Sequence, residues 1–108
     1  MLEKLYKYAT DDNKHIEKLI DVDEVMINHM VLPPGDSVPN HYSDSKVHMI
    51  IARGELTLEL DDQEPHTYPR GSIVNVPYHV FMKIRNEGNE TTEFFVTKTP
   101  SPRVYKQE

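Results

Sequence analysis

Histidines are the residues of this sequence that could do chemistry. The chain of 108 residues contains six histidines and no cysteine, so a transition-metal site would have to use imidazole nitrogens and not thiolates. His41, His48 and His79 form one candidate set of metal ligands, with the thioether of Met82 as a soft partner. A sulfur ligand would favour copper or nickel, and imidazoles also suit zinc and iron. The alternative is that no cofactor binds and that these histidines make ordinary hydrogen bonds.

A nucleophilic site has less support. Ser43 lies two residues after His41, which would place both side chains on one face of a strand. A serine–histidine pair also needs a third group that orients the histidine, and donors for an oxyanion. The sequence indicates neither, and it has no glycine-rich phosphate loop. We therefore expect Ser43 to line a pocket and not to attack a substrate.

The composition is typical of a globular protein without nucleic-acid or membrane partners. Hydrophobic residues make up 37% and charged residues 28% of the chain, a balance found in folded proteins. The formal net charge of −6 disfavours nucleic acids and anionic membranes, since both require clustered Lys and Arg. The charged N-terminus lacks the apolar region of a signal peptide, and no apolar stretch has the length of a membrane span. We expect one domain over residues 1–108, located in the cytoplasm.

Alternation and short apolar runs predict strands. Residues 55–60 alternate strictly, with three leucines on one face and Glu or Thr on the other. Residues 47–52 form a near-continuous apolar run, as in a strand that is buried on both faces. Further strands are expected at residues 25–32, 72–76, 80–85 and 92–97. Short strands punctuated by Gly or Pro in this way predict an all-β sandwich or barrel and not a βαβ fold.

The two ends of the chain are harder to assign. Apolar residues have helical spacing in the first 20 residues, and a strand is expected near residues 15–20. The segment before that strand is either a short helix or irregular. The core is expected over about residues 15–98, and the polar, proline-broken residues 99–108 are expected to form a loosely held tail. His29 lies in the 25–32 strand, where alternation assigns it to neither face.

Two blocks of the sequence share the spacing of a known pair of motifs. The matching residues are Gly35, His41, Gly54, Gly71, Pro77 and Asn86. This framework resembles the two motifs of the cupin superfamily, G-x5-H-x-H-x3,4-E-x6-G and G-x5-P-x-G-x2-H-x3-N. The resemblance covers roughly residues 25–98. It implies an all-β fold, namely a double-stranded β-helix or jelly-roll barrel. A short N-terminal helix or an extra strand added to this barrel is an alternative that stays open.

The resemblance also implies where a metal would bind. Cupins typically hold a metal with three His and one Glu. Here His41 occupies the first of these positions, while Ser43, Val47 and Met82 occupy the others. One imidazole and one thioether cannot hold zinc, iron or manganese tightly, so we expect a degenerate metal site. The residues expected to line the pocket are His41, Ser43, Val47, Met49, Met82 and Ile84.

The direction of His48 decides whether other histidines could rebuild the metal site. A period of two places Val47 and Met49 on one face of the strand and His48 on the other. His48 then points away from the pocket unless a β-bulge near residues 45–46 reverses it. His79 would lie in the loop at the mouth of the implied barrel and lean over the pocket.

Three functional hypotheses follow. The first is a protein that binds a small apolar or weakly acidic molecule in the barrel, without a metal. The second is a metal-dependent enzyme of the isomerase, dioxygenase or lyase type that uses His41, His48 and His79. The third is an interaction or dimerisation element with a filled interior. The resemblance also implies a homodimer, and the first 20 residues are where its contacts are expected.

Overall fold

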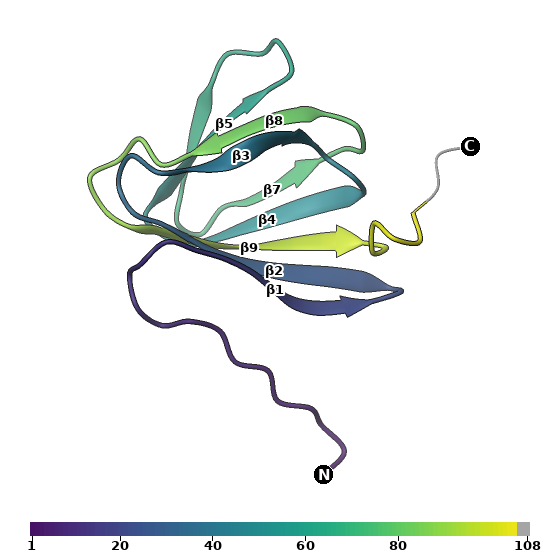
Figure 1. The fold of residues 1–108 in the computed structure, drawn as a ribbon. Coiled ribbons are helices and arrows are strands. Elements are labelled where there is room, and N and C mark those ends of the chain that lie inside the picture. Colours follow the sequence, from purple (N-terminus) through teal and green to yellow (C-terminus); the bar gives the residue numbers. More distant parts are fainter. Residues whose placement is uncertain (106–108) are drawn as a thin grey trace.

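The computed structural model describes residues 1–105, which form nine strands and no helix. Figure 1 shows the strands arranged as two antiparallel sheets that face each other. One sheet has the order β1-β2-β9-β4-β7 and the other has the order β3-β8-β5-β6. The strands are β1 (His15–Val22), β2 (Val25–Leu32), β3 (Ser37–Tyr42), β4 (Lys46–Arg53), β5 (Glu55–Leu60), β6 (His66–Pro69), β7 (Ile73–Val76), β8 (Phe81–Arg85) and β9 (Thr92–Thr99). The prediction of an all-β fold is confirmed.

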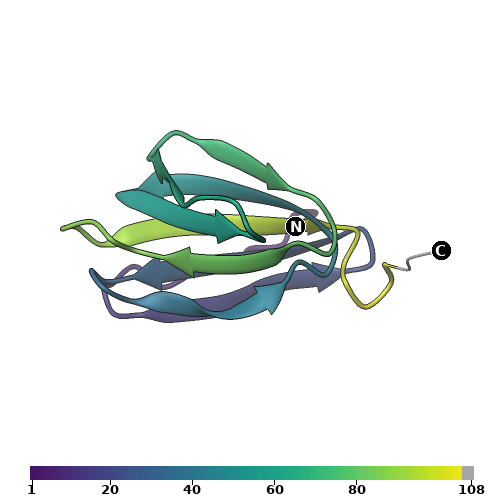
Figure 2. The same ribbon diagram turned by 90° about the horizontal axis from the view of Figure 1, so that it is seen from above.

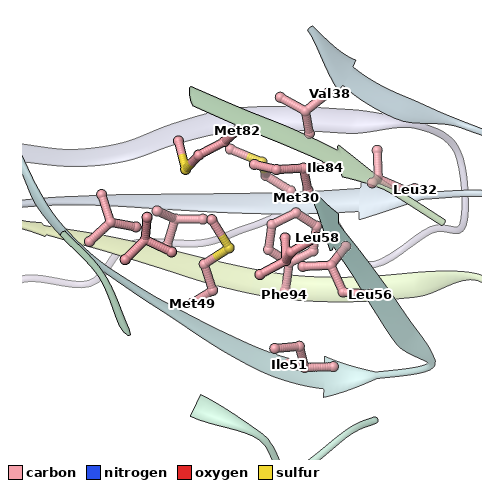
Figure 3. Close-up of a cluster of buried hydrophobic side chains, with 13 residues drawn as sticks. Met30, Leu32, Val38, Met49, Ile51, Leu56, Leu58, Met82, Ile84 and Phe94 are labelled. Carbon is pink, nitrogen blue, oxygen red and sulfur yellow. The ribbon is translucent and has the colours of Figure 1, made fainter. Parts of the chain in front are cut away.

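The core lies between the two sheets and follows from the alternation of the strands. In β4, Val47, Met49 and Ile51 are buried, whereas the residues between them face outward. Leu56 and Leu58 of β5 are buried on the opposite side of the same core. Figure 3 shows these side chains meeting in one cluster. Its members are Met30, Leu32, Val38, Val47, Met49, Ile51, Leu56, Leu58, Val76, Met82, Ile84, Phe94 and Val96.

Two corners explain why the motif spacing needs particular residues. Gly54 has a φ of 71°, and a Cβ atom there would lie 2.5 Å from the carbonyl oxygen of Thr91. Only glycine fits such a close approach of two backbones. His79, which occupies a glycine position of the second motif, has a φ of 65°. The backbone at this corner therefore keeps the left-handed conformation although the residue has a side chain.

The side chain of Asn86 connects the end of β2 with the β8–β9 turn. Its side-chain amide donates to the carbonyl oxygens of Leu32 and Glu90, both at 2.8 Å, and its Oδ1 accepts from the N–H of Gly88 at 2.9 Å. The side chain is almost fully buried. Two of these bonds hold the turn that follows Asn86, as its position in the sequence indicates.

The N-terminal residues form an irregular segment and no helix. Residues 1–14 belong to no strand either, and Figure 1 shows the first of them lying away from the sheets. The helical alternative was wrong because Leu2 and Leu5 have no core to pack against and are exposed. The strand expected near residues 15–20 is present as β1.

The C-terminal residues differ from the expected loose tail as far as Tyr105. Ser45 Oγ donates to the carbonyl oxygen of Pro100 at 2.6 Å, and Ser101, which is buried, donates to Asp21 Oδ1 at 2.6 Å. Arg103 forms an ion pair with Asp23 at 2.8 Å. These contacts attach residues 100–103 to the β1–β2 hairpin and to the connection between β3 and β4. Residues 106–108 lie outside the described part of the chain.

The loops of the two sheets gather at two opposite ends, as Figure 2 shows from above. One end carries the β8–β9 loop and the other carries the C-terminal residues. We call the latter end, where β3 and β7 finish, the barrel mouth. No helix in residues 1–105 is long and apolar enough to cross a membrane.

Candidate functional site

His41 lies near the end of β3, at the barrel mouth. Its Cα pairs with that of Met82 in β8, and the register of the two strands shifts between Val38 and His41. Residues paired in this way project to the same face, so His41 shares the inner face with the buried Met82. The ring Nδ1 lies 2.8 Å from the carbonyl oxygen of Pro39. Because a carbonyl only accepts, Nδ1 carries the proton and Nε2 of the neutral ring is an acceptor.

Ser43 clamps the loop that connects β7 to β8. Its Oγ donates to the carbonyl oxygen of Pro77 at 2.6 Å and accepts from the N–H of Val80 at 2.8 Å. The backbone of Ser43 exchanges two further hydrogen bonds with His79 and Val80. The side chain is buried. The hydroxyl is thus engaged with the backbone of this loop and takes a positioning role at the mouth.

The four apolar residues expected around the pocket lie inside the barrel. Val47, Met49, Met82 and Ile84 are each between 0% and 3% exposed. They belong to the core cluster of both sheets, and Figure 3 shows Met49, Met82 and Ile84 packed among its other members. The interior near His41 is consequently lined by aliphatic and thioether groups.

The other two candidate histidines lie outside the barrel. The Cα partners of His48 are Asn75 and Thr97, and its Nε2 lies 3.4 Å from Asn75 Nδ2 on the outer face of the sheet. The irregularity recorded in β4 falls between Ile51 and Arg53 and not near residues 45–46, so no bulge turns His48 inward. The ring of His79 stacks on Tyr42 with centroids 4.7 Å apart.

The structure therefore does not bring His41, His48 and His79 together. Among residues 1–105, no three side chains of His, Asp or Glu gather in a way that could hold a metal ion.

Asn28 is an interior polar residue that the sequence pattern did not single out. Its Cα pairs with that of Val96, a core residue, so its side chain projects between the sheets. Its Oδ1 is buried and is the one buried side-chain polar atom of the described chain without a hydrogen-bond partner. A buried acceptor without a donor is uncommon. The signal was the presence of Asn in the otherwise apolar run around it.

Two recesses open on the surface of the barrel. One, of about 200 Å³, lies at the mouth next to Met82, since Leu60 is the Cα partner of Met82. It is lined by Leu60, Asp61, Asp62, Gln63, Pro77 and Val80. The second, of about 340 Å³, lies at the opposite end and is lined by Gly54, Glu55, Pro69, Arg70, Asn89 and Glu90.

Comparison with known proteins identifies the family. The Cupin_2 family, described as a cupin domain, matches residues 28–98. The chain belongs to the cupin family. An uncharacterised protein of Methanocaldococcus jannaschii is 51% identical over 104 residues, which are 95% of this chain and 90% of that protein.

Solved structures confirm the double-stranded β-helix of this cupin. The crystal structure of an RmlC-like cupin family protein from Methanocaldococcus jannaschii has a TM-score of 0.92 at 51% identity and covers 95% of both chains. A cupin superfamily protein from Desulfitobacterium hafniense has a TM-score of 0.72 at 20% identity, over 88% of this chain and 84% of that chain. The second likeness concerns the fold alone.

The residues of this cupin do not fit the metal that the family motif implies. Of the four ligand positions, only His41 offers a strong ligand. The Ser43 hydroxyl is engaged by Pro77 and Val80, Val47 has no ligating atom, and Met82 offers a thioether.

Three polar residues of this cupin form a cluster on the outer face of the five-stranded sheet. His29 Nδ1 lies 2.7 Å from Glu17 Oε1, and His29 Nε2 lies 2.6 Å from Glu93 Oε2. Glu17 of β1 is the Cα partner of His29 in β2, whereas the β9 partner of His29 is Phe95 and Glu93 lies two residues before it. His29 faces outward, yet it is 0% exposed. The bonds from His29 and from the N–H of Ala9 hold the pKa of Glu17 below its ordinary value.

Proposed function

We propose that this cupin binds a small molecule at the barrel mouth without a catalytic metal. The observation that carries the proposal is the buried, unpartnered Oδ1 of Asn28 in the barrel interior. A native protein seldom leaves such an atom unpaired unless water or a ligand supplies the donor. The metal ligands that an enzyme of this family would use are replaced, which leaves mostly apolar groups around the one imidazole.

The chemistry of the interior indicates the class of ligand. Asn28 Oδ1 and His41 Nε2 are both acceptors, so the ligand is expected to present a hydroxyl or N–H donor. The core between the sheets includes the thioethers of Met30, Met49 and Met82, which adapt their shape to an apolar ligand more readily than branched side chains do. A small apolar or weakly acidic molecule with one donor meets these requirements.

Phenol and benzene form a matched pair of probes for this proposal, since they differ by one hydroxyl donor. In NMR titrations of the full chain, phenol is expected to shift the side-chain amide signal of Asn28 in a saturable way, whereas benzene leaves that signal in place. The physical reason is that only phenol can donate to Oδ1.

The variant Asn28→Leu is the control, because it removes the acceptor without adding a charge. It is expected to lose the saturable response of neighbouring residues to phenol while remaining folded. An unchanged response in this variant would contradict the proposal. So would a stoichiometric transition metal in protein purified without a metal-affinity tag.

We further propose that the protein is a homodimer joined through its N-terminal residues. Leu2 and Leu5 are exposed in the chain described here, although such side chains are stabilised by burial. Ile50 and Ile73 are 38% and 67% exposed on the outer face of the sheet, and Ile73 lies on the edge strand β7. If the N-terminal residues of one copy docked on this face of a second copy, the two leucines and the two isoleucines would all be buried.

The double variant Leu2→Asp/Leu5→Asp is expected to convert the dimer into a monomer, because it places charges in the contact. Sedimentation analysis at micromolar concentration measures the change. Val104→Asp is the matched control, since Val104 is also exposed but lies at the C-terminal end, and it should remain dimeric. A wild-type protein that sediments as a monomer would refute this proposal.

A further inference from the structure

The two ring nitrogens of His29 both face carboxylate oxygens. Glu17 lies on the Nδ1 side at 2.7 Å and Glu93 lies on the Nε2 side at 2.6 Å. A neutral imidazole has one N–H, so its other nitrogen would place a lone pair against a carboxylate oxygen. With both carboxylates ionised, the geometry is satisfied only when His29 carries two protons. The ring is then an imidazolium between two anions, in a position that water does not reach.

A short N-terminal segment lies over this ring. We call residues 8–12 the strap. The ring centroid of Tyr8 lies 4.5 Å from that of His29 and 5.2 Å from that of Phe95, the outward neighbour of His29 in β9. These contacts are the reason why an outward-facing histidine is buried.

The strap is connected to both carboxylates, directly to Glu17 and through Arg53 to Glu93. The N–H of Ala9 donates to Glu17 Oε1 at 3.1 Å. At the other side, Asp12 forms an ion pair with Arg53 at 2.9 Å, and Arg53 Nε donates to Glu93 Oε1 at 3.2 Å. Both anchors therefore depend on carboxylates whose orientation is set by the protons of His29.

We propose that the strap is a proton-dependent latch on the outer face of the sheet, closed while His29 carries both protons and released when one proton leaves. Loss of the proton turns one of the two short hydrogen bonds into a contact between two acceptors. The carboxylate concerned must then turn toward water, and it withdraws the anchor of the strap. Release uncovers Phe95 and extends the apolar row that continues through Ile50 and Ile73.

The charged and titratable groups around His29 come from four elements. They are Glu17 of β1, Glu93 of β9, Arg53 of β4, and Tyr8 and Asp12 of the strap. Since the folded protein holds the pKa of Glu17 below its ordinary value, this carboxylate stabilises the closed form above the ordinary glutamate range. That contribution is lost as the pH falls through the lowered pKa. The carboxylate of Glu17 therefore limits the closed form of the latch on the acid side.

A second titrating pair lies close to the strap and needs its own control. His15 Nε2 lies 2.8 Å from Asp11 Oδ1, and Asp11 is part of the strap. Loss of the proton from His15 could loosen the same segment. The variant His15→Gln removes this titration and leaves His29 and its two carboxylates unchanged.

NMR spectroscopy of the full chain tests the latch from about pH 5 to about pH 9, the range in which imidazoles titrate in proteins. The ¹⁵N signals of the His29 ring report its protonation, and the cross-peak between the Tyr8 and Phe95 rings reports the closed strap. We expect the cross-peak to disappear at the pH at which His29 loses a proton, in wild type and in His15→Gln alike. A cross-peak that persists after His29 is deprotonated would overturn the proposal.

The variant Glu93→Gln gives a result of the opposite kind. Its amide nitrogen can take the place of Oε2 and donate to a neutral His29 Nε2, while its oxygen still accepts from Arg53 Nε. The strap is then expected to stay closed over the whole alkaline range. If the transition persists in Glu93→Gln but vanishes in His15→Gln, the exposed pair controls the strap and the proposal is wrong.

Discussion

Replacing His29 with leucine is expected to lower the free energy of unfolding by about 2–4 kcal/mol at neutral pH. The substitution removes the hydrogen bonds of His29 to both Glu17 and Glu93 while keeping a side chain of similar size at a fully buried position. Removing one partner of a buried ion pair costs about 3–5 kcal/mol when the remaining charge stays buried. The expected loss is smaller here because both carboxylates keep some contact with water.

Urea unfolding followed by far-UV circular dichroism measures this loss, since the chain has no tryptophan to report it. The double variant His29→Leu/Glu17→Gln is the matched control. It removes one of the two stranded charges, so the two substitutions should be less costly together than their separate effects predict. A single variant within about 0.5 kcal/mol of wild type would show that the cluster contributes no more than an ordinary surface contact.

Replacing Asn86 with alanine is expected to lower the free energy of unfolding by about 3–5 kcal/mol. Each buried group left unpaired costs about 1–3 kcal/mol, and the lower part of the summed range applies because two of the three bonds are only partly buried. The carbonyl oxygens of Leu32 and Glu90 lose their amide donor, and the N–H of Gly88 loses its acceptor. Urea unfolding at neutral pH measures the effect.

The variant Asn86→Asp separates the lost donors from the lost volume. Its carboxylate keeps the volume and the bond from Gly88, but it cannot donate to Leu32 or Glu90. It is therefore expected to be at least as destabilised as alanine at neutral pH. Because protonation restores one O–H donor, part of the loss should be recovered in acid relative to wild type. An Asn86→Asp protein as stable as wild type at neutral pH would contradict the role of the two donors.

The candidate site was predictable where it depends on local pattern. A period of two along residues 47–52 placed Val47 and Met49 inside the barrel and His48 outside, and the structure confirms this arrangement. The motif spacing indicated that Asn86 would hold the next turn, and its bonds to Gly88 and Glu90 do so. Such features involve residues that are neighbours in the chain, so their geometry follows from the strand and the turn.

The candidate site was not predictable where partners are distant in the chain. The sequence did not indicate that the hydroxyl of Ser43 bonds to the loop that begins 34 residues later, at Pro77. Asn28 and His29 are consecutive polar residues in an apolar strand, so alternation alone could not tell which of them faces the interior. The pairing of β2 with β9 settles this question, since it places Asn28 opposite the core residue Val96 and His29 opposite Phe95.

The sequence by itself determined the all-β fold, the corners of the barrel and the loss of three of the four family metal ligands. These properties depend on residue type, alternation and short spacings, which act within a strand or a turn. Only the tertiary structure decided that His29 is buried between Glu17 and Glu93 and that Asn28 is left without a donor. The reason is that sheet register and the path of the N-terminal residues bring together groups that are distant in the chain, such as Glu17 and Glu93, which are 76 positions apart. Local sequence patterns do not predict such contacts, because these contacts depend on the packing of the whole chain.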